Sequence, residues 1–131
     1  MADRQKLPRS RSGVTTSFEV GDADGYMIVS RYDDSGAPGE VFLKLGKQGS
    51  TVAGLVDAFS LMLSLALQYG VPLETITQKL SEMRFEPMGY TDDPEIPRVK
   101  SIVDYVARRL ALDFSVSIPE SLGVDSGRII A

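Results

Sequence analysis

The segment 46–51 (GKQGST) holds the residues best suited to chemistry in this chain, because it joins a predicted strand to the start of a predicted helix. Free N–H groups at a helix start, the helix dipole and a nearby lysine together favour an anion. The lysine precedes the second glycine, so the segment is not a Walker A loop. A flexible turn with a helix N-cap at Ser50 or Thr51 explains the same residues. The candidate residues for binding phosphate or a nucleotide are Lys47, Gly49, Ser50 and Thr51.

A second candidate is the RFEP segment, residues 84–87. Arg84 carries a planar guanidinium that can form paired hydrogen bonds to a carboxylate or a phosphate. An ion pair from Arg84 to Glu82 or Glu86 that fixes the loop is the structural alternative. We take Arg84 and Glu86 as candidate interaction residues.

Three carboxylates cluster at Asp92, Asp93 and Glu95. Hard cations such as calcium take oxygen ligands, but a solvated acidic loop is the commoner meaning of such a run. No pair of carboxylates in the sequence has a spacing that demands general acid–base catalysis. The sequence therefore predicts no catalytic residue and no metal ligand.

The 131 residues include no cysteine and no histidine. This composition excludes disulfides, zinc sites built on cysteine or histidine, thiol redox chemistry and Ser-His-Asp or Cys-His catalysis. The net charge of −4 argues against general binding to nucleic acid or to an anionic membrane. Base stacking on strand aromatics is the contrary possibility, but these residues fall where core positions are expected: Phe18, Tyr26, Tyr32 and Phe42.

The two ends of the chain differ from its middle. Residues 1–12 lack the apolar core of a signal peptide, and we expect a mobile basic arm. An arm that touches an acidic partner or a phosphate backbone is the alternative. Residues 115–131 have no clear periodicity and are predicted to be an irregular tail. The basic residues of the arm are Arg4, Lys6, Arg9 and Arg11.

Hydrophobic periodicity predicts strands at 14–20, 26–32 and 40–45, separated by turns rich in Gly, Asp and Pro. Short connections favour an antiparallel meander. Helices are predicted at 51–69, 73–83 and 98–114. The fold class is therefore α+β, with a three-stranded antiparallel sheet packed with three helices. An i,i+4 pair of Asp104 and Arg108 is expected on the solvent-exposed face of the last helix.

The helix at 51–69 is apolar almost all round. Such a helix is normally buried on most sides, so we expect a near-fully buried central helix, covered by the sheet and by a second subunit. It is barely long enough to span a membrane, but Asp57 and Gln68 within it argue against that. Its narrow seam of small or polar residues consists of Gly54, Asp57, Ser60, Ser64 and Gln68.

Residues 46–89, together with GEVF at 39–42 and KSIVDY at 100–105, resemble one known module. It is the C-terminal, TSCPD-type domain of adenosylcobalamin-dependent (class II) ribonucleotide reductases. The resemblance covers roughly residues 7–114, and we place the domain at 13–114. In the resembled enzymes a cysteine-bearing tail often follows this domain, whereas here the tail has no cysteine.

The resemblance implies a part in deoxyribonucleotide synthesis. Ribonucleotide reduction in that family needs a thiyl radical and a reducing cysteine pair, and this chain can supply neither. We therefore expect a free-standing accessory or split-off domain, non-catalytic alone and cytoplasmic, whose partner is a reductase catalytic chain or a second copy of itself. Adenosylcobalamin is implied for the partner chain and no cofactor for this one. The alternative is a non-enzymatic oligomeric module that binds a protein or a phosphorylated small ligand.

Overall fold

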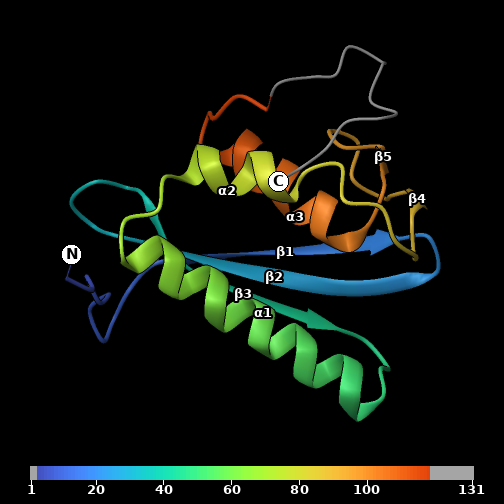
Figure 1. The fold of residues 1–131 in the computed structure, drawn as a ribbon, viewed down its shortest axis with the longest axis horizontal. Coiled ribbons are helices and arrows are strands. Elements are labelled where there is room, and N and C mark those ends of the chain that lie inside the picture. Colours follow the sequence, from blue (N-terminus) through green and yellow to red (C-terminus); the bar gives the residue numbers. More distant parts are fainter. Residues whose placement is uncertain (1–2, 119–131) are drawn as a thin grey trace. The chain divides into compact units, whose positions relative to one another are not determined.

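The computed structural model describes residues 3–118. The chain divides into two compact units, the first made of Met1–Phe18 and Ala23–Val71, the second of Glu19–Asp22 and Pro72–Ala131. The predicted α+β class is confirmed, with a three-stranded antiparallel sheet and three helices among the described residues (Figure 1).

The sheet has the order β1-β2-β3, formed by β1 (Gly13–Val20), β2 (Ala23–Arg31) and β3 (Pro38–Leu45). β2 and β3 pair antiparallel from Gly25↔Leu45 to Arg31↔Pro38, with a bulge between Ser30 and Arg31. The alternation seen in the sequence is the alternation of burial, since one side of each strand supplies core residues. These are Phe18, Val20, Met27, Val29, Val41 and Leu43.

Helix α1 (Ser50–Gln68) runs alongside the edge strand β3 (Figure 1). The Ser60 hydroxyl accepts the N–H of Leu43, and the Ser64 hydroxyl accepts the N–H of Val41 and donates to its carbonyl oxygen. The Gln68 amide donates to the carbonyl of Gly39 at 2.9 Å. These contacts occupy backbone groups of an edge strand that would otherwise be open to pairing with another chain.

The spacing of these contacts is a match between two periodicities. Four helical residues advance about 6.0 Å and two strand residues about 6.6 Å. Serine and glutamine at i, i+4 and i+8 of α1 can therefore reach every second residue of β3, with the two elements running in opposite directions.

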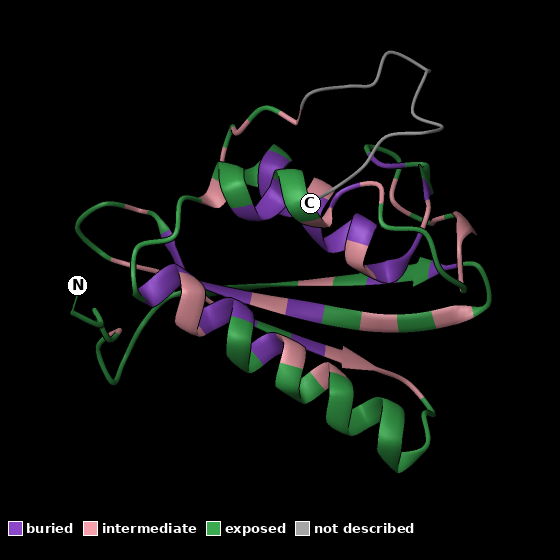
Figure 2. Ribbon diagram, viewed as in Figure 1, coloured by how far each residue is buried: buried purple, intermediate pink, exposed green. Residues whose placement is uncertain are grey.

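The expected near-full burial of the central helix is only partly supported in the single chain. Only 22% of an apolar 18-residue stretch of α1 is buried, and the buried positions lie in the second half of the helix (Figure 2). Ser60, Ser64 and Gln68 of the polar seam pack inward because edge-strand donors and acceptors need partners, whereas Gly54 and Asp57 are exposed. Much of the apolar surface is left exposed as a result. The buried residues of α1 are Ser60, Leu63, Ser64, Leu67 and Gln68.

The second unit contains helix α2 (Leu73–Leu80), the two-stranded sheet of β4 (Gly89–Tyr90) and β5 (Arg98–Val99), and helix α3 (Ile102–Asp113). Helices α2 and α3 pack against each other. Its core residues are Ile76, Thr77, Ile96, Val99, Ile102, Tyr105, Val106 and Leu110.

Two helix boundaries differ from the predictions. The helix predicted from residue 98 begins at Ile102, because residues 98–99 pair with β4 and the Ser101 hydroxyl caps the helix by accepting the N–H of Asp104 at 2.9 Å. The helix predicted to reach residue 83 ends at Leu80, since Glu82 takes a left-handed conformation (φ 72°) and gives its N–H to Asp104.

Residues 3–12 of the predicted arm lie along the first unit. Gln5 donates its N–H to the carbonyl of Gln68 at 2.9 Å, and Arg4 bonds the side chain of Gln68 at 2.7 Å. Arg11 pairs with Glu40 at 2.8 Å. Two of the four basic side chains thus have internal partners, and the mobility of the arm stays a prediction. Residues 1–2 of the arm and 119–131 of the tail lie outside the described residues.

Candidate functional site

The turn before α1 has an uncapped helix start. Gly49 is the N-cap residue and no side chain caps it, so the predicted cap at Ser50 or Thr51 is wrong: Ser50 is already the first helical residue. Lys47 is exposed and has a backbone φ of 48°, a left-handed conformation that residues other than Gly and Asn seldom adopt.

One feature of this turn opposes an anion. The carboxylate of Asp24 lies against Gly46: if Gly46 had a Cβ, that atom would be 2.8 Å from an oxygen of Asp24. A negative charge therefore lies beside the turn. The structure places Lys47, Gly49, Ser50 and Thr51 together at the start of α1, all exposed. Anion binding there remains a prediction, with Asp24 as the group that an anion must tolerate.

Arg84 and Glu86 are both exposed, on the segment between α2 and β4. Within residues 3–118 neither side chain forms an ion pair, so the loop-fixing pair weighed from the sequence is absent there. Glu86 lines an open pocket of about 460 Å³ with Gly21, Asp22, Pro87 and Met88. The two carboxylates of this pocket favour a cationic or hydrogen-bond-donating group over an anion.

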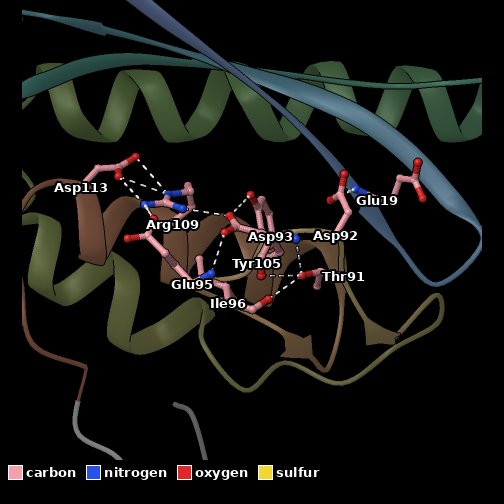
Figure 3. Close-up of polar contacts among 9 residues, drawn as sticks. All are labelled: Glu19, Thr91, Asp92, Asp93, Glu95, Ile96, Tyr105, Arg109 and Asp113. Carbon is pink, nitrogen blue, oxygen red and sulfur yellow. Dashed lines mark hydrogen bonds and ion pairs between the residues drawn. The ribbon is translucent and has the colours of Figure 1, made fainter.

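Within the acidic run at 92–95, Asp93 and Glu95 belong to an ionic cluster around Arg109, which is 9% exposed, while Asp92 and Glu95 remain solvent-exposed as expected (Figure 3). The guanidinium donates to Asp93 at 2.8 Å, to Glu95 at 2.9 Å and to Asp113 at 2.7 Å. The Tyr105 hydroxyl donates to Asp93 at 2.7 Å. The planar five-donor fork of arginine suits this arrangement of three carboxylates.

The loop that carries these carboxylates is held by further hydrogen bonds (Figure 3). The Asp92 side chain accepts the N–H of Glu19 at 2.8 Å. The Thr91 hydroxyl accepts the N–H of Asp93 at 3.0 Å and donates to the carbonyl of Ile96. The loop is therefore positioned as a rigid structural element.

The electrostatics of the cluster follow from burial opposed by hydrogen bonding. Burial alone raises the pKa of Asp93, but hydrogen bonds from Tyr105 and Arg109 outweigh it and lower that pKa below its ordinary value. Burial, and then the hydrogen bond to Asp93, raises the pKa of Tyr105. Burial lowers the pKa of Arg109, yet bonds to Asp113, Asp93 and Glu95 raise it overall. These pKa shifts favour a charged Arg109, an ionised Asp93 and a neutral Tyr105.

A second ionic cluster centres on Asp104, which is 1% exposed. Its carboxylate accepts the N–H groups of Glu82 and Lys100, each at 2.8 Å, and Nε of Arg108 at 2.9 Å. Glu82 in turn pairs with Lys100 at 2.6 Å and with Arg108. The i,i+4 pair of Asp104 and Arg108 is confirmed, but its placement on the solvent-exposed face is wrong for Asp104, because this carboxylate is 1% exposed and accepts the backbone N–H groups of Glu82 and Lys100.

Both clusters use their charges internally. No buried side-chain nitrogen or oxygen in the described part of the chain lacks a hydrogen-bond partner, and no group of three or more acidic side chains there is placed to hold a metal ion. Saturated groups of this kind stabilise a fold and are not poised for proton transfer. Neither cluster draws on the exposed side of α1, the turn before it or the segment at 84–88.

The comparisons with known proteins show the family of this chain. The TSCPD domain family matches residues 3–114, and the chain belongs to that family. Similar proteins named vitamin B12-dependent ribonucleotide reductase come from Streptantibioticus cattleyicolor and Streptomyces coelicolor, each 61% identical over 111 residues, and from Rhodopirellula baltica, 48% identical over 111 residues. Each match covers 85% of this chain but only 11–18% of the relative's length. No solved structure matches.

That this chain binds no cofactor stays a prediction. It has no histidine that could ligate a cobalt ion, and in the described part no unsatisfied buried polar atom marks a place for the cofactor in the relatives' name.

Two sets of important residues were missed by sequence reasoning. Arg109 lies on the polar side of a predicted helix and gave no signal of its own. The i, i+4, i+8 spacing of Ser60, Ser64 and Gln68 was visible, and a polar ladder at that spacing on an apolar helix indicates a contact with backbone groups.

Proposed function

We propose that this chain is a non-catalytic TSCPD domain that works with the catalytic part of a vitamin B12-dependent ribonucleotide reductase in deoxyribonucleotide synthesis. The observation that carries the proposal is 61% identity over 85% of the chain to proteins of that name. Identity at this level across both units supports retention of the domain's role. The cytoplasm is the compartment that fits such a role.

The domain acts by association. The chain has no cysteine for thiol chemistry, and the ionic clusters around Arg109 and Asp104 bind their own side chains and backbone. In our proposal the catalytic cysteines and the cobalamin belong to the remainder of the reductase, and this chain acts in trans as an accessory domain.

The experiment uses the Streptomyces coelicolor relative with its matching 111 residues deleted. We expect this chain to have no reductase activity alone, to bind the truncated enzyme in sedimentation, and to raise its conversion of ribonucleotides to deoxyribonucleotides. Circular dichroism first establishes that the truncated enzyme is folded. A folded truncated enzyme that neither binds the chain nor responds to it would refute the proposal.

A matched pair of variants tests the candidate interaction residue. Arg84→Ala removes an exposed guanidinium without an internal ion pair in residues 3–118, whereas Lys79→Ala removes an exposed cation from α2. We expect Arg84→Ala to weaken binding to the truncated reductase by about 10-fold or more, as for an interface arginine. Lys79→Ala should change it little. Equal effects would mean that only net charge matters.

The second candidate function is a module that binds a phosphorylated small ligand, favoured by the uncapped start of α1 beside Lys47. Titration of inorganic phosphate and of ATP tests it. Lys47→Ala should weaken binding about 10-fold, and Asp24→Asn should strengthen it because a nearby negative charge is removed. Ser50→Ala should leave stability unchanged, since Ser50 is not the cap. No binding at about 1 mM would remove this candidate.

A further inference from the structure

The side of α1 that faces away from β3 carries an apolar stripe of five residues. Leu55, Met62 and Tyr69 recur every seven residues and are 66%, 64% and 46% exposed. Ala58, exposed, and Leu65, half-buried, lie between them at spacings of three and four. Figure 2 shows how much of the helix is open, above all in its first half.

This spacing is the a/d pattern of a helix that packs against another helix. The stripe contains no charge. The one charged residue of α1 is Asp57, which pairs with Lys44 at 3.2 Å. An identical stripe meets no like-charge repulsion here, so the surface is electrostatically self-compatible, and closed two-fold pairing is the commonest arrangement for identical chains.

The helix dipoles select the direction of pairing. In an antiparallel pair centred on Met62, each residue faces the one at the same distance on the other side of Met62, so Leu55 faces the partner's Tyr69 and Met62 faces the partner's Met62. The two helix dipoles are then opposed, whereas a parallel pair would align them unfavourably.

We propose that two copies of this chain form a two-fold symmetric dimer through antiparallel packing of their α1 helices, with Met62 on the axis. The 19 residues of α1 span about 28 Å, and packed helices lie about 8–10 Å apart. One helix pair buries less than the roughly 800 Å² per partner of a standard interface, so the dimer should be weak, in the range of about 1–100 µM. The proposal does not rest on the reductase assignment.

Sedimentation across a concentration series provides the first test. Met62→Glu puts two carboxylates together on the axis and should weaken the dimer by about 100-fold. Val14→Glu, on an equally exposed β1 position, should not. Mixing the Met62→Glu protein with Met62→Lys should restore dimers that neither forms alone. Circular dichroism confirms that each variant is folded.

Disulfide trapping provides the second test, and it is clean because the chain has no native cysteine. Met62→Cys should cross-link to its own copy. Leu55→Cys should cross-link with Tyr69→Cys but not with itself, because antiparallel helices hold the two Leu55 positions about 20 Å apart.

Three results would overturn the proposal. They are a monomer at about 1 mM, self-cross-linking of Leu55→Cys, and a monomeric chain whose Met62→Glu variant loses binding to the truncated reductase. The last result would assign the stripe to the catalytic part.

Discussion

Replacing Asp104 by asparagine removes one charge from the most buried carboxylate among residues 3–118. Its Oδ1 accepts from the N–H of Glu82 and from Nε of Arg108, and its Oδ2 accepts from the N–H of Lys100. Asparagine keeps one acceptor oxygen and places an NH₂ group where the other oxygen was. Whichever way the amide turns, at least one backbone N–H then faces a donor.

The free energy at stake is large for a domain of this size. Each hydrogen bond to a charged group contributes about 1.5–3 kcal/mol, and removing one partner of a buried ion pair costs about 3–5 kcal/mol. The contributions overlap, so we expect Asp104→Asn to lower the free energy of unfolding by about 3–5 kcal/mol. That is a large part of the roughly 5–15 kcal/mol typical of a folded domain.

The assay is urea unfolding followed by circular dichroism. Asp57→Asn is the matched control, because the Asp57 side chain is 53% exposed and its pair with Lys44 lies at the surface. Exposed pairs contribute about 0–1 kcal/mol, so the control should unfold nearly as the parent does. An Asp104→Asn protein within about 1 kcal/mol of the parent, with an unchanged urea dependence, would refute the reasoning.

Three further predictions concern single side chains. Ser64→Ala leaves the buried N–H of Val41 without its partner and should cost about 1–3 kcal/mol in urea unfolding, whereas Ser64→Thr, which keeps the hydroxyl, should cost less. Arg109→Lys cannot reproduce the three-carboxylate geometry and should lower the thermal midpoint by several degrees, about 4–8 °C per kcal/mol lost. The pKa of Tyr105 is raised above its ordinary 10.0, so its stabilisation is complete below pH 10.0 and is lost as pH rises through the raised value. Tyr105→Phe should therefore be less stable than the parent at pH 7, as the hydroxyl's bond to Asp93 is gone, and the difference should shrink above pH 10.0.

The sheet could be predicted from the sequence because its strands have one buried and one exposed side. Met27 and Val29 alternate with half-buried or exposed residues, and Val41 and Leu43 do the same on the next strand. Alternation of this kind carries the burial pattern directly into the sequence.

Helix α1 could not be placed by the same reasoning. Hydrophobicity predicts which side of a helix is buried only where its neighbour is apolar. The edge strand β3 instead presents backbone N–H groups that need hydrogen-bond partners. Ser60 and Ser64 accept from these groups and face inward, so the outward side includes Leu55 and Met62. The average hydropathy of a helix does not reveal which side a neighbouring strand needs.

The ionic clusters were equally hidden, because they join residues far apart in sequence. Arg109 meets Asp93 and Glu95 only once β4, β5 and α3 are arranged. The sequence spacing predicts that Asp104 forms a surface ion pair, but in the structure its carboxylate also accepts the backbone N–H of Glu82. A charge's partner is set by tertiary contacts, and the sequence spacing shows only the i,i+4 partner.

The residues that stabilise this domain differ from those that are open to a partner. The charged groups that could attract attention as a site, around Arg109 and Asp104, satisfy one another and so hold their loops in place. Two exposed features of the described residues, the apolar stripe of α1 and the uncapped helix start at Gly49, lie on one helix. Because the polar side of that helix is committed to β3, its outward side cannot turn inward without breaking the contacts of Ser60 and Ser64. Mutations at these two serines should therefore weaken self-association as well as stability, whereas Met62→Glu should affect self-association alone.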